Sequence, residues 1–320
     1  MPPAVYVLAV AADSRRPGTL YAGTITHGLQ KSVDGGATWN PTAGAFPPLG
    51  EAITERPAAI VSLALDPSRR GLLYAGTSSG GILRTADGGA SWTTANHGLA
   101  GLTARSGGSV HPPVAALVVD PARPRTVYAS VLGAGVFKSV DGGARWQRAR
   151  AGLASLNVEA LVLDPSHPGT LYAGTEGEGV FKSLDGGTRW QAAGLAGKYV
   201  EALGFEPARP QVVYAGTLHG GVFRTEDGGS RWRAASNGLG NGYVRALVPD
   251  QRRPGTVFAG TLGGVFETAD GGRHWRPLNN GLRNRLVQAL LLVGDTLYAG
   301  TLGSGIFVLD GAAGATRRAA

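Results

Sequence analysis

One five-residue segment recurs seven times along this chain, and its spacing limits the folds that the chain can adopt. The first copy is Leu20-Tyr21-Ala22-Gly23-Thr24. Its aromatic residue recurs at intervals of roughly 40 to 54 residues, at Tyr74, Tyr128, Tyr172, Tyr214, Phe258 and Tyr298. Several short β-type segments in each unit, repeated at such a period, are typical of propeller blades. The repeat therefore predicts a ring of seven similar units.

A second motif follows the first six copies at a fixed offset, and we call its copies the box turns. The first copy runs from Ser32 through Asp34-Gly35-Gly36 to Trp39. Their aspartates are Asp34, Asp87, Asp141, Asp185, Asp227 and Asp270, and their closing residues, the only tryptophans of the chain, are Trp39, Trp92, Trp146, Trp190, Trp232 and Trp275. Aspartate accepts hydrogen bonds from nearby backbone N–H groups, and glycine adopts positive φ without steric penalty. Because identical carboxylates around a ring cannot share one catalytic site, we interpret the box turns as structural, with their tryptophans packed between sheets.

The fourth repeat shows four strands. The first is expected at 158–163, the second at 170–175, the third at 180–183 and the fourth from Trp190. β-Branched and aromatic residues, interrupted by glycine and proline, favour strands over helices. We predict an all-β fold, a seven-bladed propeller of four-stranded antiparallel blades, as one domain over residues 1–310. The repeats are expected to start near residues 4, 58, 113, 157, 199, 243 and 286.

The seventh repeat departs from the others. After Ile306 to Asp310 it has no box turn and no tryptophan. Its fourth strand is expected to be missing or improvised from Ala315 to Arg318, which leaves an incomplete last blade with three firm strands and a flexible basic tail at 311–320. Only Met1 to Ala4 precede the first strand. We therefore expect repeat 1 to pack against repeat 7 without a shared blade, at the weakest interface of the ring.

The box turns carry a resemblance to known proteins. The pattern Ser/Thr-x-Asp-Gly-Gly-x-x-Trp resembles the Asp-box, or bacterial neuraminidase repeat, and covers nearly the whole chain. Families that share it include sialidases, xyloglucan-degrading glycosidases, sortilin-type receptors and photosystem II assembly factors. The resemblance implies the propeller fold but does not distinguish among these functions.

Composition excludes several kinds of site. The chain has no cysteine, which rules out disulfides and thiol catalysis, and its histidines show no metal-ligand spacing. We expect no cofactor and no metal. No stretch is long and apolar enough for a transmembrane segment, and the N-terminal apolar run fits a first strand better than a signal peptide. The expected compartment is the cytoplasm, or a secreted or periplasmic location if a leader was removed.

Strand alternation divides the loops between two faces. The box turns and the Asp-Pro turns share one face, which we call the box face. The short glycine-rich turns and the interblade connections share the other, the loop face, where the resemblance places glycosidase sites. Two connections are longer than the rest, Pro41 to Ala59 and Asn96 to Pro113. Long loops on a rigid scaffold commonly carry binding sites, but tolerated insertions would look the same.

The chain carries a net charge of +8, and most of its excess positive charge falls on the predicted outer strands. The cations of the third strands are Lys31, Arg84, Lys138, Lys182 and Arg224. Cations at exposed edges discourage aggregation between strands. They could equally contact an anionic surface. No basic run with interleaved aromatic residues is present, which argues against nucleic acid.

One polar cluster is a candidate catalytic or binding site. Glu159 and Glu201 hold the same place in neighbouring first strands, with Arg245 and Gln288 as counterparts in the next two repeats. Tyr199 and Tyr243 each stand just before such a strand. Glycoside hydrolysis needs two carboxyl groups on either side of the sugar bond. The alternative is a solvated channel wall with an internal Glu–Arg pair.

Two functions remain open. The first is a non-catalytic binding or assembly scaffold, monomeric by itself, that recognises a protein or glycan partner through the loop face. The second is a glycan-acting hydrolase or lyase with a site around Glu159 and Glu201. No set of three convergent arginines with a tyrosine nucleophile, as a sialidase requires, can be assembled from the sequence, which favours the scaffold.

Overall fold

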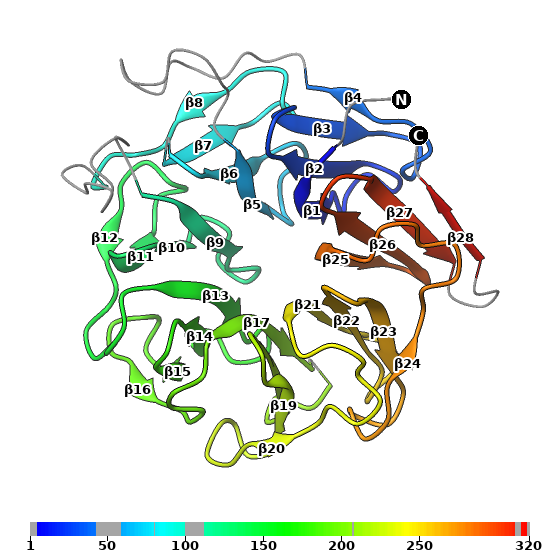
Figure 1. The fold of residues 1–320 in the computed structure, drawn as a ribbon. Coiled ribbons are helices and arrows are strands. Elements are labelled where there is room, and N and C mark those ends of the chain that lie inside the picture. The colour runs from blue at the N-terminus through cyan, green and yellow to red at the C-terminus, as the bar shows by residue number, and fades with distance from the viewer. Residues whose placement is uncertain are drawn as a thin grey trace.

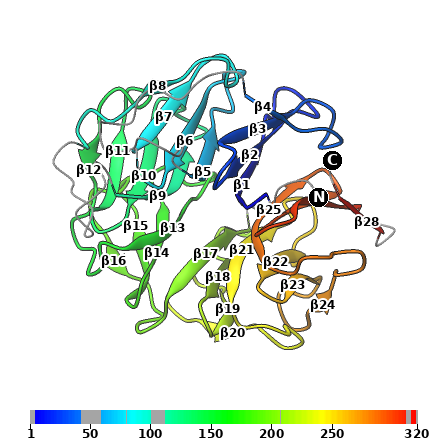
Figure 2. The same ribbon diagram turned by 45° about the horizontal axis from the view of Figure 1, so that its top comes forward.

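The computed structural model describes residues 5–42, 59–79, 81–99, 112–206, 208–310 and 315–318. Seven antiparallel sheets of four strands each stand around a central axis (Figure 1, and tilted in Figure 2). The expected seven-bladed all-β propeller is confirmed, and the described residues contain no helix. The longest part of each extended interblade connection, residues 43–58 and 100–111, lies outside the described residues.

The two strands nearest the axis are the most regular part of each blade. The inner strands are β1 (Val7–Ala12), β5 (Ile60–Leu65), β9 (Val114–Val119), β13 (Val158–Leu163), β17 (Val200–Phe205), β21 (Val244–Pro249) and β25 (Val287–Val293). The second strands are β2 (Leu20–Thr24), β6 (Leu73–Thr77), β10 (Val127–Val131), β14 (Leu171–Thr175), β18 (Val213–Thr217), β22 (Val257–Thr261) and β26 (Thr296–Thr301). Apart from Thr296, every residue of the second strands is buried.

The outer half of each blade is shorter and more exposed. The third strands are β3 (Leu29–Ser32), β7 (Ile82–Thr85), β11 (Gly135–Ser139), β15 (Gly179–Ser183), β19 (Gly221–Thr225), β23 (Gly264–Thr268) and β27 (Gly305–Asp310). The fourth strands are β4 (Asn40–Pro41), β8 (Thr93–Thr94), β12 (Gln147–Arg148), β16 (Gln191–Ala192), β20 (Arg233–Ala234), β24 (Arg276–Pro277) and β28 (Ala315–Arg318).

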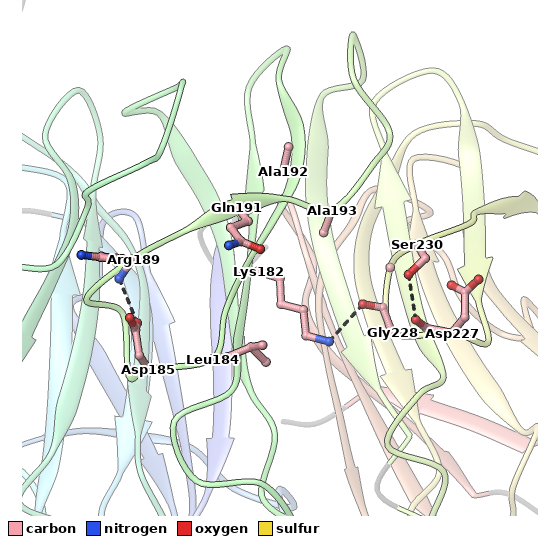
Figure 3. Close-up of a pocket in the computed structure, with 11 residues that line it drawn as sticks. Lys182, Leu184, Asp185, Arg189, Gln191, Ala192, Ala193, Asp227, Gly228 and Ser230 are labelled. Carbon is pink, nitrogen blue, oxygen red and sulfur yellow. Dashed lines mark hydrogen bonds between the residues drawn. The ribbon is translucent and has the colours of Figure 1, made fainter.

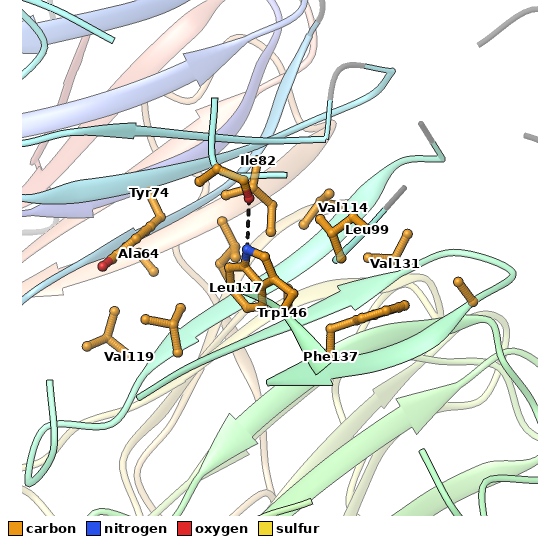
Figure 4. Close-up of a cluster of buried hydrophobic side chains, with 14 residues drawn as sticks. Ala64, Tyr74, Ile82, Leu99, Val114, Leu117, Val119, Val131, Phe137 and Trp146 are labelled. Carbon is orange, nitrogen blue, oxygen red and sulfur yellow. Dashed lines mark hydrogen bonds between the residues drawn. The ribbon is translucent and has the colours of Figure 1, made fainter. Parts of the chain in front are cut away.

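The core of the molecule lies between neighbouring blades. Figure 4 shows one such cluster, in which Trp146 packs among residues of blades 2 and 3 such as Ile82 and Leu117. The glycine of the repeated second strand permits this approach. A Cβ on Gly174 would lie 2.6 Å from Cγ1 of Val200 on the next blade. A side chain on Gly174 would overlap the neighbouring sheet, whereas blade 3 has Ser130 at this position, whose hydroxyl accepts from the Ala116 N–H at 2.9 Å.

Each box turn is closed by its own side chains. In the first copy the Ser32 hydroxyl donates to Asp34 (2.7 Å) and accepts from the Gly36 N–H (2.8 Å), while Asp34 accepts from the Thr38 N–H (2.9 Å). Both glycines have positive φ, 71° and 87°. Hydrogen bonds from Thr38 and Ser32 lower the pKa of Asp34 to about 2, because they stabilise the charged carboxylate.

The tryptophans that close the box turns attach them to the preceding blade. Four are buried, and Trp39 and Trp232 are half-buried. The indole N–H of Trp190 donates to the Ala149 carbonyl at 2.7 Å, and Trp146, Trp232 and Trp275 make the same contact with Ala95, Ala193 and Ala235. Trp39 instead bonds within its own turn, to Gly36 at 3.2 Å. Four of the tryptophans therefore make a hydrogen bond between blades.

A second contact between blades uses the carbonyl oxygen of the first glycine in the box turn. It accepts from a tyrosine hydroxyl of the preceding blade or from the lysine beside that tyrosine. The tyrosine bonds are Tyr74 to Gly142, Tyr172 to Gly228 and Tyr298 to Gly35, each 3.0 Å. The lysine bonds are Lys31 to Gly88 (3.0 Å), Lys138 to Gly186 (3.0 Å) and Lys182 to Gly228 (3.2 Å).

The cations of the third strands already have partners within the ring. Lys31, Lys138 and Lys182 lie over the tyrosine rings beside them, at 5.1–5.5 Å from the ring centres. Arg224 lies over Tyr214 and pairs with Glu226, and Arg84 is half-buried. Three of the five, Lys31, Lys138 and Lys182, thus already join neighbouring blades, and contact of the five with an anionic surface stays a prediction.

Blade 6 lacks the tyrosine and the cation that join other blades to the next box turn. It alone has Phe258 in place of the tyrosine and Glu267 in place of the cation. The next blade is the one whose sequence has no box turn. Glu267 instead pairs with Arg276 of its own blade. Blade 7, which precedes the box turn of blade 1, keeps the tyrosine, Tyr298, but has Val308 in place of the cation. The tyrosine therefore occurs in each blade that is followed by a box turn.

Blade 7 differs from the incomplete blade that the sequence suggested. Residues 315–318 pair with β27 as strand β28, from Phe307↔Arg318 to Asp310↔Ala315. The fourth strand is thus the improvised one, and this part of the tail is not free. The physical reason is that β27 has an open edge with unpaired backbone groups, which the nearest available segment can satisfy.

Among the described residues, no blade combines strands from the two ends of the chain, and the ring closes by packing of blade 1 against blade 7. β1 contacts β25 and β26, and a Cβ on Gly300 would lie 2.7 Å from Val7, much as a Cβ on Gly174 would approach Val200. The Val5 carbonyl accepts from the Gly303 and Gly305 N–H groups at 3.2 and 3.0 Å. That this interface is the weakest of the seven stays a prediction.

Replacing Trp190 by alanine should lower the free energy of unfolding by about 3–5 kcal/mol, because a buried ring and a bond between blades are both lost. The matched variant Trp39→Ala should cost clearly less, because Trp39 is half-buried and bonds only within its turn. Denaturant unfolding measures both. Equal losses, or an unchanged Trp190→Ala protein, would show that these contacts between blades do not stabilise the fold.

Candidate functional site

The polar cluster expected from the sequence lies on three adjacent inner strands. Glu159, Glu201 and Arg245 are each the second residue of β13, β17 and β21, and these strands contact one another in turn. Nη1 of Arg245 donates to Oε2 of Glu201 at 2.6 Å, with the side chains 30% and 15% exposed. The structure therefore joins two of the three residues into an ion pair, as the channel-wall interpretation expects.

Glu159 is the member of the cluster without a direct partner. Among the described residues, none forms an ion pair or hydrogen bond with its carboxyl group. Burial raises the pKa of Glu159 to about 7, with smaller contributions from the charges of Glu201 and Glu176, while Arg245 acts in the opposite direction. The carboxyl group can thus give or take a proton near neutral pH.

A ring of seven residue pairs frames the channel at the loop face. In each blade the residue just before the inner strand accepts a backbone hydrogen bond from the residue just after the second strand. The pairs are Tyr6–Ile25, Ala59–Ser78, Pro113–Leu132, Asn157–Glu176, Tyr199–Leu218, Tyr243–Leu262 and Leu286–Leu302. The hydrogen bonds fix the backbone of this mouth and leave the side chains to vary.

Those side chains divide the mouth into two unlike parts. On blades 5, 6, 7 and 1 all eight are aromatic or large aliphatic residues, which we call the mouth arc: Tyr199, Leu218, Tyr243, Leu262, Leu286, Leu302, Tyr6 and Ile25. None is buried, and four are exposed: Tyr199 (43%), Leu286 (41%), Ile25 (39%) and Tyr6 (38%). Among the described large apolar side chains only Val33, Val140 and Leu184, one in each of three box turns, are more exposed. Blade 4 instead presents Asn157, which donates to Glu176 at 2.6 Å.

The expected tyrosines belong to this arc. Tyr199 is exposed, and Tyr243 is held by an edge-to-face contact with His219, whose ring centre lies 4.3 Å away. Sequence reasoning missed Tyr6, Ile25 and Leu286. Alignment of the repeats at the residue before each inner strand would have found Tyr6 and Leu286 beside Tyr199 and Tyr243.

Two other hollows lie away from the mouth. A groove of about 470 Å³ between the outer edges of blades 4 and 5 is lined by Lys182, Asp185 and Asp227 (Figure 3). Its charged groups hold the turns: Lys182 bonds to Gly228, and Asp185 accepts from the Arg189 N–H at 2.8 Å. The box-face end of the channel forms a hollow of about 520 Å³ with a mainly aliphatic wall.

Metal and membrane sites find no support in the described part of the chain. None of its groups of histidine, aspartate and glutamate is placed to hold a metal ion. The described residues also include no helix that is long and apolar enough to cross a membrane.

Solved structures of different function share this fold. A GH74 xyloglucanase from Xanthomonas campestris aligns with a TM-score of 0.76 at 19% identity, over 98% of this chain and 53% of the enzyme. YCF48 bound to D1 peptide aligns at 0.67 and 18%, over 96% and 94% of the two chains. YCF48 from Cyanidioschyzon merolae aligns at 0.67 and 15%, over 96% of each.

These comparisons show the fold alone. The chain spans about half the length of the xyloglucanase. No protein-family model matches the sequence, and no curated protein does.

Charge coupling within the cluster can be measured. The variant Glu201→Gln should lower the pKa of Glu159 from about 7 towards its ordinary value, because one repelling charge is removed. Arg245→Met should raise it, because the attracting charge is lost. Carboxyl-carbon NMR titration of glutamate-labelled protein, with Glu159→Gln to assign the signal, measures both. A midpoint that stays constant in the two variants would contradict the arrangement.

Proposed function

We propose that the chain is a non-catalytic binding scaffold built on Asp-box repeats, and that the loop face around the channel mouth recognises a protein or glycan partner. The mouth arc is the observation that supports this proposal. Contiguous exposed apolar surface on a soluble protein marks an interaction site more often than chance. Side chains on loops of a rigid scaffold commonly serve binding.

The polar side chains of the box turns and the apolar side chains of the mouth have different roles, and this difference supports binding at the loop face. On the box face, Asp34, Ser32 and their equivalents in the other box turns are used in hydrogen bonds that close the turns. At the mouth, the backbone groups bond to one another and the side chains of Tyr199 and Leu286 project without a packing role that explains their exposure. A binding role accounts for large apolar groups there.

Glycoside hydrolysis is the second candidate, and one observation favours it. Glu159, with its raised pKa, would act as a general acid beside Glu201, which pairs with Arg245. The ion pair also argues against this role, because it engages Glu201 at 2.6 Å. The xyloglucanase likeness is one of fold at 19% identity and adds no catalytic residue.

Capture of partners tests the binding proposal. The chain, immobilised through an added tag, should retain proteins or glycans from an extract of its source. The variant Tyr199→Ala with Leu286→Ala should lose at least one of them. The matched variant Val140→Ala with Leu184→Ala removes exposed apolar groups from the box face and should retain all. Identical retention by both variants would count against the loop face.

Activity assays decide between the two candidates. The scaffold proposal predicts no turnover of aryl glycosides, xyloglucan or other polysaccharides by the purified chain. Turnover that disappears in both Glu159→Gln and Glu201→Gln, while the fold is retained, would replace the scaffold proposal with the hydrolase.

A further inference from the structure

Uncompensated carboxylates gather on the blade 4 side of the channel mouth. Glu159 has no partner among the described residues, and Glu176 and Glu178 are exposed on the adjoining turn. Arg245, the arginine whose charge acts on Glu159, is already paired with Glu201. Lys198 lies over the Phe223 ring, at 5.8 Å from its centre. This side of the mouth therefore has negative charge without matching positive charge.

The neighbouring mouth arc offers apolar contact but few hydrogen-bonding groups. The backbone carbonyls of Tyr6, Tyr199, Tyr243 and Leu286 already accept hydrogen bonds within the ring. Five of the eight arc residues are aliphatic. A glycan needs many paired polar groups, because its hydroxyls lose water on binding. An apolar polypeptide side chain has no such requirement.

Building on the proposed function, we propose that the mouth takes a polypeptide segment in which a lysine or arginine stands beside aromatic or large aliphatic residues. The apolar side chains lie on the mouth arc, and the cation enters the channel beside Glu159. Charge complementarity selects this occupant on the blade 4 side, because an acidic group there would meet Glu159, Glu176 and Glu178 while Arg245 is paired with Glu201. The exposed Arg283 and Arg285 belong to the blade 7 side, just before Leu286. Below Glu159 the channel wall is mainly aliphatic, so the cation stops at the mouth.

The charge of Glu159 makes this recognition sensitive to pH. The groups that face it are Glu201, Glu176 and Arg245. With a pKa of about 7, Glu159 loses its charge as the pH falls through neutrality, and a bound cation then loses its partner. Binding of the cation requires the ionised form, so affinity rises with pH. The ionised fraction changes about tenfold between pH 8 and pH 6, which sets the largest expected change in affinity.

Fluorescence anisotropy with defined peptides tests the inference. The probe is a labelled acetyl octapeptide amide that carries one phenylalanine, one leucine and one lysine among glycines and serines. Matched probes replace the lysine by norleucine or glutamate, or both apolar residues by serine. The first probe should bind at least tenfold more tightly than each matched probe at pH 8, and should weaken about tenfold at pH 6.

Variants assign the site. Glu159→Gln should weaken the lysine probe at pH 8 to its pH 6 level and remove the pH dependence, and Tyr199→Ala should weaken it about tenfold. Glu226→Gln and Leu184→Ala on the box face are the matched controls and should change nothing. Circular dichroism melting of each variant shows that the ring is intact. Equal affinity for the lysine and glutamate probes, or preferential binding of xylo-oligosaccharides at the mouth, would overturn the inference.

The two proposals can fail separately. If the Tyr199→Ala, Leu286→Ala variant loses a captured partner but no peptide shows the lysine preference, the scaffold proposal stands and the cationic segment is wrong. If neither capture nor peptide binding depends on the mouth, both are wrong.

Discussion

The carbonyl oxygen of the first glycine in a box turn is the acceptor through which neighbouring blades are joined. In five of the six box turns it accepts from a tyrosine or lysine of the preceding blade. The tryptophan of the turn often returns a hydrogen bond to that same blade, as Trp190 does to Ala149. The turn must hold both glycines at positive φ to present this oxygen, and its serine or threonine and aspartate maintain that shape. Sheet stacking around the ring follows from these contacts together with the close approach at the second-strand glycines.

Much of this frame could be predicted from sequence, because period, turn chemistry and strand composition are local properties. The strands of repeat 4 fell within a residue of their expected limits, as Val158–Leu163 shows. The role of the cations could not be predicted, because whether Lys182 faces solvent or the next turn depends on the tertiary packing of two blades. One signal was available: Phe258 and Glu267 occur together in the blade that precedes the missing box turn. The strand β28 was hard to predict because its composition, Ala-Thr-Arg-Arg, has little strand preference. It forms because the backbone groups at the open edge of β27 need hydrogen-bond partners.

The candidate site shows a similar division. Alignment of the repeats placed Glu159, Glu201 and Arg245 on one wall, and the ion pair was an expected alternative. The pKa of Glu159 is raised because its carboxyl group is buried and because Arg245 pairs with Glu201 instead. Neither the burial nor the choice of partner can be predicted from the spacing of residues in the sequence. The mouth arc escaped notice because its members come from blades 5, 6, 7 and 1, and only ring closure brings Tyr6 beside Leu302. Because the box turns join the blades, the side chains at the opposite mouth can differ from blade to blade without loss of the fold. The binding function proposed for the chain depends on these variable side chains.

Denaturant unfolding of two tyrosine variants tests the joining of the blades most directly. The Tyr74 hydroxyl donates to Gly142, whereas the buried Tyr128 hydroxyl has no hydrogen-bond partner among the described residues, because Lys138 supplies the donor there. Tyr74→Phe should therefore lower the free energy of unfolding by about 1 kcal/mol or more, because the glycine carbonyl loses its donor. Tyr128→Phe removes the same atom from the same place in the next blade and should leave the stability unchanged or slightly higher. Equal losses in the two variants would contradict the claim that the box-turn carbonyl holds the blades together.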